Sequence, residues 1–160
     1  CINPVVDLSG AMNTNDNGLI GMSDKNNDPL DASGNFSLSG QDSITLLPGT
    51  YFFNTLTLTG GSTISVTDST TFFIVGDISV SGGGIVNVTQ LPSNLAIITT
   101  ATTVEWGGSS SYFGSIVAPD AALKISGGAD LFGAALAGTL EMTGGSDFHV
   151  DTSLCLVLNP

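Results

Sequence analysis

A phrase of two alternating apolar residues followed by a glycine pair recurs five times in this 160-residue chain. It first reads Leu56-Thr-Leu58-Thr-Gly60-Gly61, and it returns around the glycine pairs that begin at Gly82, Gly107, Gly127 and Gly144. Successive pairs begin 22, 25, 20 and 17 residues apart. Self-similarity at about 20 residues is typical of stacked supersecondary units. The repeat therefore predicts that the chain winds into coils.

Each repeat unit has the residue pattern of β-strands. The alternation directs Leu56 and Leu58 to the interior and the threonines to solvent. The glycine pairs mark corners, where the backbone needs positive φ or close approach. Further strands are predicted at 62–67 and 85–89, and more continuously apolar ones at 71–75, 95–99, 112–117 and 131–136. We therefore predict an all-β fold, a parallel β-helix (β-solenoid) of about five to six coils, with three short strands per coil and no long helix.

The first 43 residues differ in composition from the rest. They are rich in Asn, Asp, Ser and Gly, the residue types of turns and loops. We therefore expect residues 1–43 to form a loop-rich N-terminal cap or extension with one or two short strands. Residues 44–160 are expected to form the solenoid and a C-terminal strand.

The charge of the chain is strongly one-sided. Fourteen acidic residues face only two basic ones, Lys25 and Lys124, and the net charge is −12. This charge argues against nucleic acid and anionic membrane partners. No continuous apolar stretch reaches the roughly 18–20 residues of a membrane-spanning helix, so no membrane insertion is expected. The charge either keeps a glycine-rich β-protein soluble or supplies oxygen ligands for a cation such as calcium.

One segment of the expected cap imitates a twelve-residue calcium-binding loop. Oxygen donors fall at the first, third, fifth and twelfth positions, with a glycine at the sixth. The candidate ligands are Asn13, Asn15, Asp16, Asn17 and Asp24. The first position holds Asn where Asp is usual, and the last holds Asp where Glu is usual. Calcium is therefore a candidate cofactor, and an Asn-rich surface loop is the alternative; no other cofactor is indicated.

Two groups of residues are candidates for a catalytic role. His149, the only histidine, lies two residues from Asp147 and from Asp151, so all three can share a strand face. Glu105 and Glu141 occupy equivalent places two coils apart, at a predicted separation of roughly 10 Å. That separation is at or beyond the upper end of the range for paired glycosidase carboxylates. We assign no catalytic residue and expect a non-enzymatic protein, with a carbohydrate-active β-helix enzyme as a remote alternative.

From about residue 47 to residue 154 the chain resembles the β-solenoid domain of bacterial cell-surface and pilus-assembly-associated proteins. The resemblance rests on Pro48-Gly-Thr-Tyr-Phe52, Val75-Gly-Asp-Ile-Ser-Val80, Phe113-Gly-Ser-Ile-Val-Ala-Pro119, Phe132-Gly-Ala-Ala135 and Ser146-Asp-Phe-His-Val-Asp151. It implies an exported, non-enzymatic module at the cell surface. The Asn/Asp-rich start departs from the family pattern. No catalytic residue carries over from that family.

The two cysteines lie close to the two ends of the sequence. Cys1 and Cys155 suggest a disulfide and an oxidising, extracellular compartment. An N-terminal segment that runs back along the rod would allow a bond within one molecule. A bond from Cys1 of one subunit to Cys155 of the next would instead generate a filament.

The last residues favour assembly. Ser153-Leu-Cys-Leu-Val-Leu158 alternates, so Leu154, Leu156 and Leu158 are predicted to form an inserted strand. We expect a subunit of a cell-surface fibre or pilus-like assembly, a head-to-tail homopolymer formed by end-to-end stacking of solenoids with Cys1/Cys155 linkage. The alternative is a monomeric adhesion or binding module for a glycan or another cell-surface ligand, in which calcium would add stability.

Overall fold

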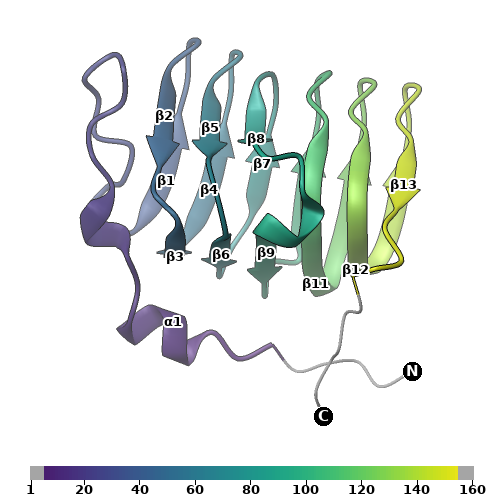
Figure 1. The fold of residues 1–160 in the computed structure, drawn as a ribbon, viewed down its shortest axis with the longest axis horizontal. Coiled ribbons are helices and arrows are strands. Elements are labelled where there is room, and N and C mark those ends of the chain that lie inside the picture. The colour runs from purple at the N-terminus through teal and green to yellow at the C-terminus, as the bar shows by residue number, and fades with distance from the viewer. Residues whose placement is uncertain (1–5, 155–160) are drawn as a thin grey trace.

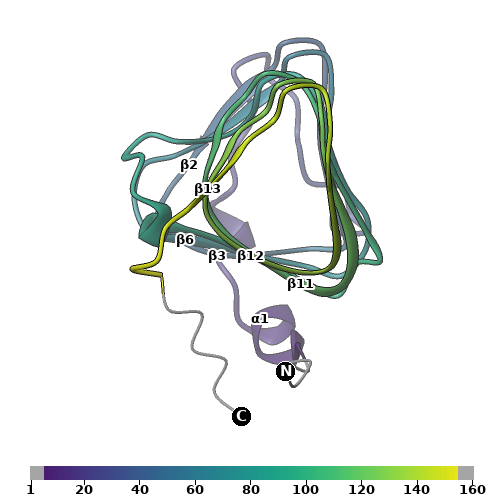
Figure 2. The same cartoon turned by 90° about the vertical axis from the view of Figure 1, so that its right-hand side faces the viewer.

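A computed structural model describes residues 6–154 of the chain, and these residues form a parallel β-solenoid of about six coils (Figures 1 and 2). The predicted fold class is confirmed. The helices within residues 6–154 are all short: α1 (Ser9–Asn13), η1 (Asn17–Leu19) and η2 (Pro92–Asn94). None of the helices in this range is long and apolar enough to cross a membrane.

The first three coils contain three strands each, as the repeat predicted. They are β1 (Asn35–Leu38), β2 (Ser43–Leu46) and β3 (Gly49–Phe53), then β4 (Thr55–Leu58), β5 (Thr63–Val66) and β6 (Thr70–Ile74), then β7 (Ile78–Val80), β8 (Gly84–Asn87) and β9 (Leu95–Thr99). Strands β2, β5 and β8 form a sheet of their own, and the others belong to a ten-stranded sheet. β1 lies within residues 1–43, the segment expected to be the cap. The first coil therefore begins at Asn35 and not at residue 44.

The later coils have two strand segments each and lack the third. Their strands are β10 (Thr103–Trp106), β11 (Tyr112–Ile125), β12 (Leu131–Met142) and β13 (Phe148–Val150). Long strands β11 and β12 continue from one side of the solenoid to the next, and they pair with each other through a register shift at residues 118–122. Too few residues follow each of these glycine pairs to form a counterpart of β8: β11 begins four residues after Gly108.

The glycine pairs stack on one another at one corner of the coils. Gly60, Gly82, Gly108, Gly127 and Gly144 all have positive φ, between 65° and 97°. A Cβ on Gly82 would lie 2.4 Å from the backbone nitrogen of Gly61, and a Cβ on Gly127 would lie 2.9 Å from that of Gly108. The corner therefore excludes side chains for two reasons, backbone conformation and close packing of successive coils.

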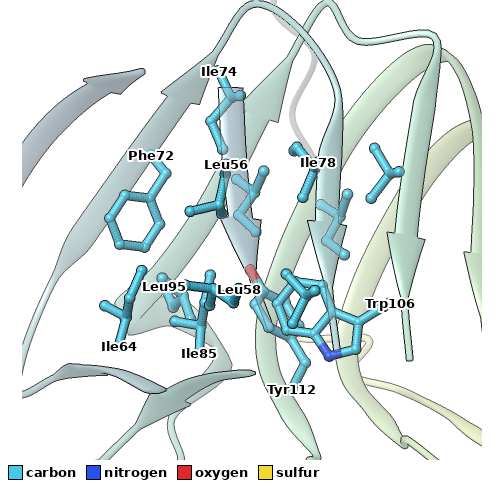
Figure 3. Close-up of a cluster of buried hydrophobic side chains, with 14 of the residues drawn as sticks. Leu56, Leu58, Ile64, Phe72, Ile74, Ile78, Ile85, Leu95, Trp106 and Tyr112 are labelled. Atoms are coloured by element: carbon cyan, nitrogen blue, oxygen red, sulfur yellow. The ribbon is translucent and has the colours of Figure 1, made fainter. Parts of the chain in front are cut away.

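The interior is filled mainly by alternate residues of strands β1 to β12, some of which are drawn in Figure 3. Aromatic rings concentrate in the first coils, where the Phe36 and Phe53 rings lie 4.9 Å apart and those of Tyr51 and Phe72 5.9 Å apart. Later coils place small residues such as Ala118 and Ala129 inside. The core thus becomes smaller along the axis, in keeping with the shorter later coils.

Replacement of a corner glycine tests this packing. Gly82→Ala should lower the free energy of unfolding by more than the about 1–3 kcal/mol that positive φ alone costs, because the new Cβ also overlaps the Gly61 backbone. Gly145→Ala is the matched control, since Gly145 has φ of 82° but nothing within 4 Å of its added Cβ. Guanidinium unfolding of the two variants measures the difference, and equal losses would contradict a close-packed corner.

Candidate functional site

The two ends of the solenoid differ from its middle, because a terminal coil has a neighbouring coil on one side only. A stack of parallel coils leaves backbone N–H and C=O groups unpaired at each end, and these groups must be capped or must bind another chain. The two ends of this molecule meet that requirement differently.

At the N-terminal end, side chains of residues 16–17 pair with the free edge of β3. The Asp16 carboxylate accepts a hydrogen bond from the Thr50 N–H at 2.7 Å. The Asn17 amide makes two bonds with Phe52, accepting from its N–H at 2.9 Å and donating to its carbonyl at 2.6 Å. These side chains therefore take the part of a neighbouring strand.

The edges of β1 and β2 are paired as well. The Ser37 N–H donates to the Pro29 carbonyl at 2.8 Å, next to an antiparallel bridge between Leu30 and Phe36. The Asp24 carboxylate accepts from the Ser43 N–H at 2.8 Å. All three strands of the first coil thus bond to residues 14–34. From here on, the name cap refers to these residues, which are part of the segment 1–43 that was expected to cap the solenoid.

A buried carboxylate holds the cap to the first coil. Asp42 is 1% exposed and accepts hydrogen bonds from the Ser23 hydroxyl at 2.7 Å, the Asn27 amide at 2.8 Å and the Lys25 N–H at 3.1 Å. Burial alone would raise the pKa of Asp42, but hydrogen bonding with the Asn27 amide and the Asp24 carboxyl, and then with Ser23 and the Lys25 N–H, outweighs burial and holds the pKa well below its usual range. Asp42 is therefore a charged anchor for the loop that carries Ser23, Lys25 and Asn27.

The candidate calcium ligands take part in this cap or in α1. Asn13 and Asn15 donate from their amides to the carbonyls of Ser9 and Ala11, and the Asn15 side-chain oxygen accepts from the Asn17 N–H. Oxygens of Asp16 and Asn17 bond β3, whereas the Asp24 carboxylate bonds Ser43 of β2. The structure thus brings Asp16 and Asn17 together at one strand and places Asp24 at another; calcium binding stays a prediction.

A groove crosses the outer face of β7, β10, β11 and β12. In register on neighbouring strands lie Glu105, Lys124 and Glu141, and the Lys124 ammonium is 3.8 Å from the Glu105 carboxylate. A lysine therefore lies between the two carboxylates of the candidate glycosidase pair. Both members of the ion pair are about half exposed, so its contribution to stability is small.

At the C-terminal end, apolar side chains reach solvent. Leu140 of β12 is 45% exposed and Val150 of β13 is 62% exposed. Leu154, predicted to begin an inserted strand, is partly buried, and its N–H donates to the Asp151 carbonyl at 3.2 Å. The other residues of the assembly and disulfide predictions, Cys1, Cys155, Leu156 and Leu158, lie outside the described residues.

The same end brings together three residues that can hold a cation. Ligand atoms of Asp130, Asp147 and His149 all lie within 4.8 Å of one another, and the Asp130 carboxylate accepts the Asp147 N–H at 3.0 Å. Sequence reasoning grouped His149 with Asp147 and Asp151 and missed Asp130. The repeat contained the signal, because Leu131 pairs with Phe148 and so places Asp130 beside Asp147.

The His149 ring ends an aromatic ladder. It stacks on Phe132 at 4.2 Å with planes 4° apart, and Phe132 stacks on Phe113 at 4.5 Å with planes 8° apart. Each ring thus covers the face of its neighbour. Trp106 and Tyr112 are instead buried in the core, where their rings meet edge to face.

Comparison with known proteins gives a family without a function. A family model described as a domain of unknown function (DUF7305) matches residues 54–156, more than half of the chain. No curated protein and no solved structure matches the chain.

The buried carboxylate makes a testable contribution to acid stability. Because the pKa of Asp42 is lowered by folding, its stabilisation is complete above the ordinary value of 3.8 and declines as the pH falls below it. Asp42→Asn should reduce stability at pH 7 and flatten the loss between pH 4 and pH 2. Glu141→Gln makes the same charge change at an exposed site. It should leave unchanged both the stability at pH 7 and the loss of stability between pH 4 and pH 2. Melting temperatures across this pH range measure the effect, and parallel curves for wild type and Asp42→Asn would contradict the anchor.

Proposed function

The chain belongs to the DUF7305 family of domains of unknown function, and we propose that it is a non-enzymatic structural subunit of an extracellular, cell-surface fibre or pilus-like assembly. A β-solenoid is consistent with a structural or binding role. The observation that carries the proposal is that both ends present exposed apolar side chains and that the two ends are unlike. Subunits that join head to tail through unlike ends form an open filament.

The chemistry of each end supports this contact. Leu19 and Met22 of the cap are 55% and 53% exposed, and Leu140 and Val150 are exposed at the opposite end. Because the edges of β1, β2 and β3 are already hydrogen-bonded to the cap, the contact joins side chains of the cap to the last coil. It is therefore not a continuation of coil upon coil, and it does not need a disulfide between subunits.

The proposed location and the absence of catalysis have separate support. The net charge of −12 and the pair of cysteines suit an exported protein. Lys124 lies between Glu105 and Glu141 and bonds the first of them, which suits a solvated surface better than a pair of catalytic carboxylates.

Self-association under reducing conditions tests the proposal. Wild-type protein should form concentration-dependent oligomers in light scattering after size exclusion, and filaments in negative-stain microscopy. Leu140→Lys/Val150→Lys should weaken association at least about tenfold, because each lysine places a charge in an apolar contact. Leu19→Lys/Met22→Lys, in the cap at the opposite end, should weaken association to a similar degree.

The matched control is Val86→Lys/Val88→Lys, which adds the same charge at two exposed valines on and beside β8, along the side of the rod. It should associate like wild type. A compact monomer at every concentration would overturn the fibre and favour the monomeric binding module.

A further inference from the structure

One side of the solenoid is apolar on its outer surface as well as inside. On neighbouring strands β3, β6, β9, β11 and β12, five outward-facing residues lie in register: Phe52, Phe73, Ile98, Val117 and Leu136. We call this row the outer ladder. All five are partly buried, whereas the opposite faces of the same strands form the core. On β4 and β10 the outward positions are polar, for example Thr57 and Glu105.

Strands that are apolar on both faces are typical of sheets covered on both sides. Alternation fails at Tyr51-Phe52-Phe53, where every residue is aromatic, and at Phe72-Phe73-Ile74. The outer ladder therefore implies a covering segment, and the described chain supplies part of one.

The segment before the cap covers the ladder at its first strand. Helix α1 packs against β3, and Leu8 and Ala11 are buried. Figures 1 and 2 show this segment beneath the sheet that contains β3 and β6, running along the solenoid axis. Traced back from α1 toward lower residue numbers, it heads toward β11 and β12. We call residues 1–13 the strap, of which residues 6–13 are described.

The five residues that precede Val6 can reach the rest of the ladder. They read Cys1-Ile2-Asn3-Pro4-Val5, with two apolar side chains and a proline that needs no N–H partner. Fully extended, five residues span about 17 Å, more than three strand spacings of about 4.8 Å. Cys155 directly follows Leu154, which comes after the last coil.

We propose that Ile98, Val117 and Leu136 of the outer ladder bind residues 1–5 of the same chain, and that this docking brings Cys1 beside Cys155. The two thiols then form a disulfide within the molecule. With oxidised glutathione as the oxidant, each cysteine gives up its hydrogen, one S–S bond forms between them, and one glutathione disulfide is reduced to two glutathione thiols. A bond within one molecule excludes the Cys1–Cys155 bond between subunits, and it does not depend on the proposed fibre.

Substitutions in the strap test the docking without altering the solenoid. In glutathione redox buffer, with the protein dilute, wild type should form an intrachain Cys1–Cys155 bond, identified by non-reducing peptide mapping of a monomer. Ile2→Asp/Val5→Asp should lower the effective concentration of the two thiols at least tenfold, because aspartate does not bury against an apolar face. It should also speed hydrogen exchange in α1. Asn3→Asp adds charge at a polar residue of the same segment and should change neither by more than about twofold.

A substitution on the ladder completes the test. Val117→Asp should lower the effective concentration of the two thiols at least tenfold, as Ile2→Asp/Val5→Asp does. The melting temperature of Val117→Asp verifies that this variant is folded. Three outcomes would overturn the proposal: bonds between chains in place of an intrachain bond, an intrachain bond that Ile2→Asp/Val5→Asp leaves unchanged, or sensitivity only to Leu156→Asp/Leu158→Asp, which would assign the ladder to the C-terminal residues.

Discussion

The backbone hydrogen bonds between successive coils are the interaction on which every other feature of this molecule depends. They require that each coil lie directly above the last, and at one corner the coils approach so closely that a Cβ on Gly82 would lie 2.4 Å from the Gly61 nitrogen. The stacked glycines fix the register between coils. That register then aligns side chains into rows, such as Glu105 beside Lys124 and Phe113 beside Phe132.

The same backbone bonding creates the asymmetry between the ends. At the first coil, oxygens and amides of Asp16, Asn17 and Asp24 replace a missing strand, and buried Asp42 anchors the loop that carries one of them. At the last coil, apolar Leu140 and Val150 reach solvent. Both ends thus carry exposed apolar side chains, but the first coil is closed by a hydrogen-bonded cap and the last coil is not, and this difference gives the molecule the direction that a head-to-tail contact needs.

Local periodicity was enough to predict the coils, because alternation and the glycine pairs both report on neighbouring residues. It could not predict the bonds of the cap, since Asp16 and Thr50 are 34 residues apart in the sequence. The loss of the third strand after β8 has a local cause that the sequence contains, because β11 begins only four residues after Gly108 and leaves no room for another strand. Asp130 beside Asp147 required the register between coils, which only aligned repeats supply.

Strands that are apolar on both faces indicate that another segment covers them, but their own sequence does not identify that segment. Phe52 and Phe73 break the alternation that the rest of the solenoid follows, and a bare row of such residues would form the kind of apolar patch that soluble proteins rarely expose. α1 covers this row at β3, on the side of the rod. Since the proposed fibre contact uses the two ends, a strap along the side and assembly through the ends do not compete for the same surface. Covering the ladder within one chain would also direct association to the ends, because the side of the rod would then offer little apolar surface to another copy.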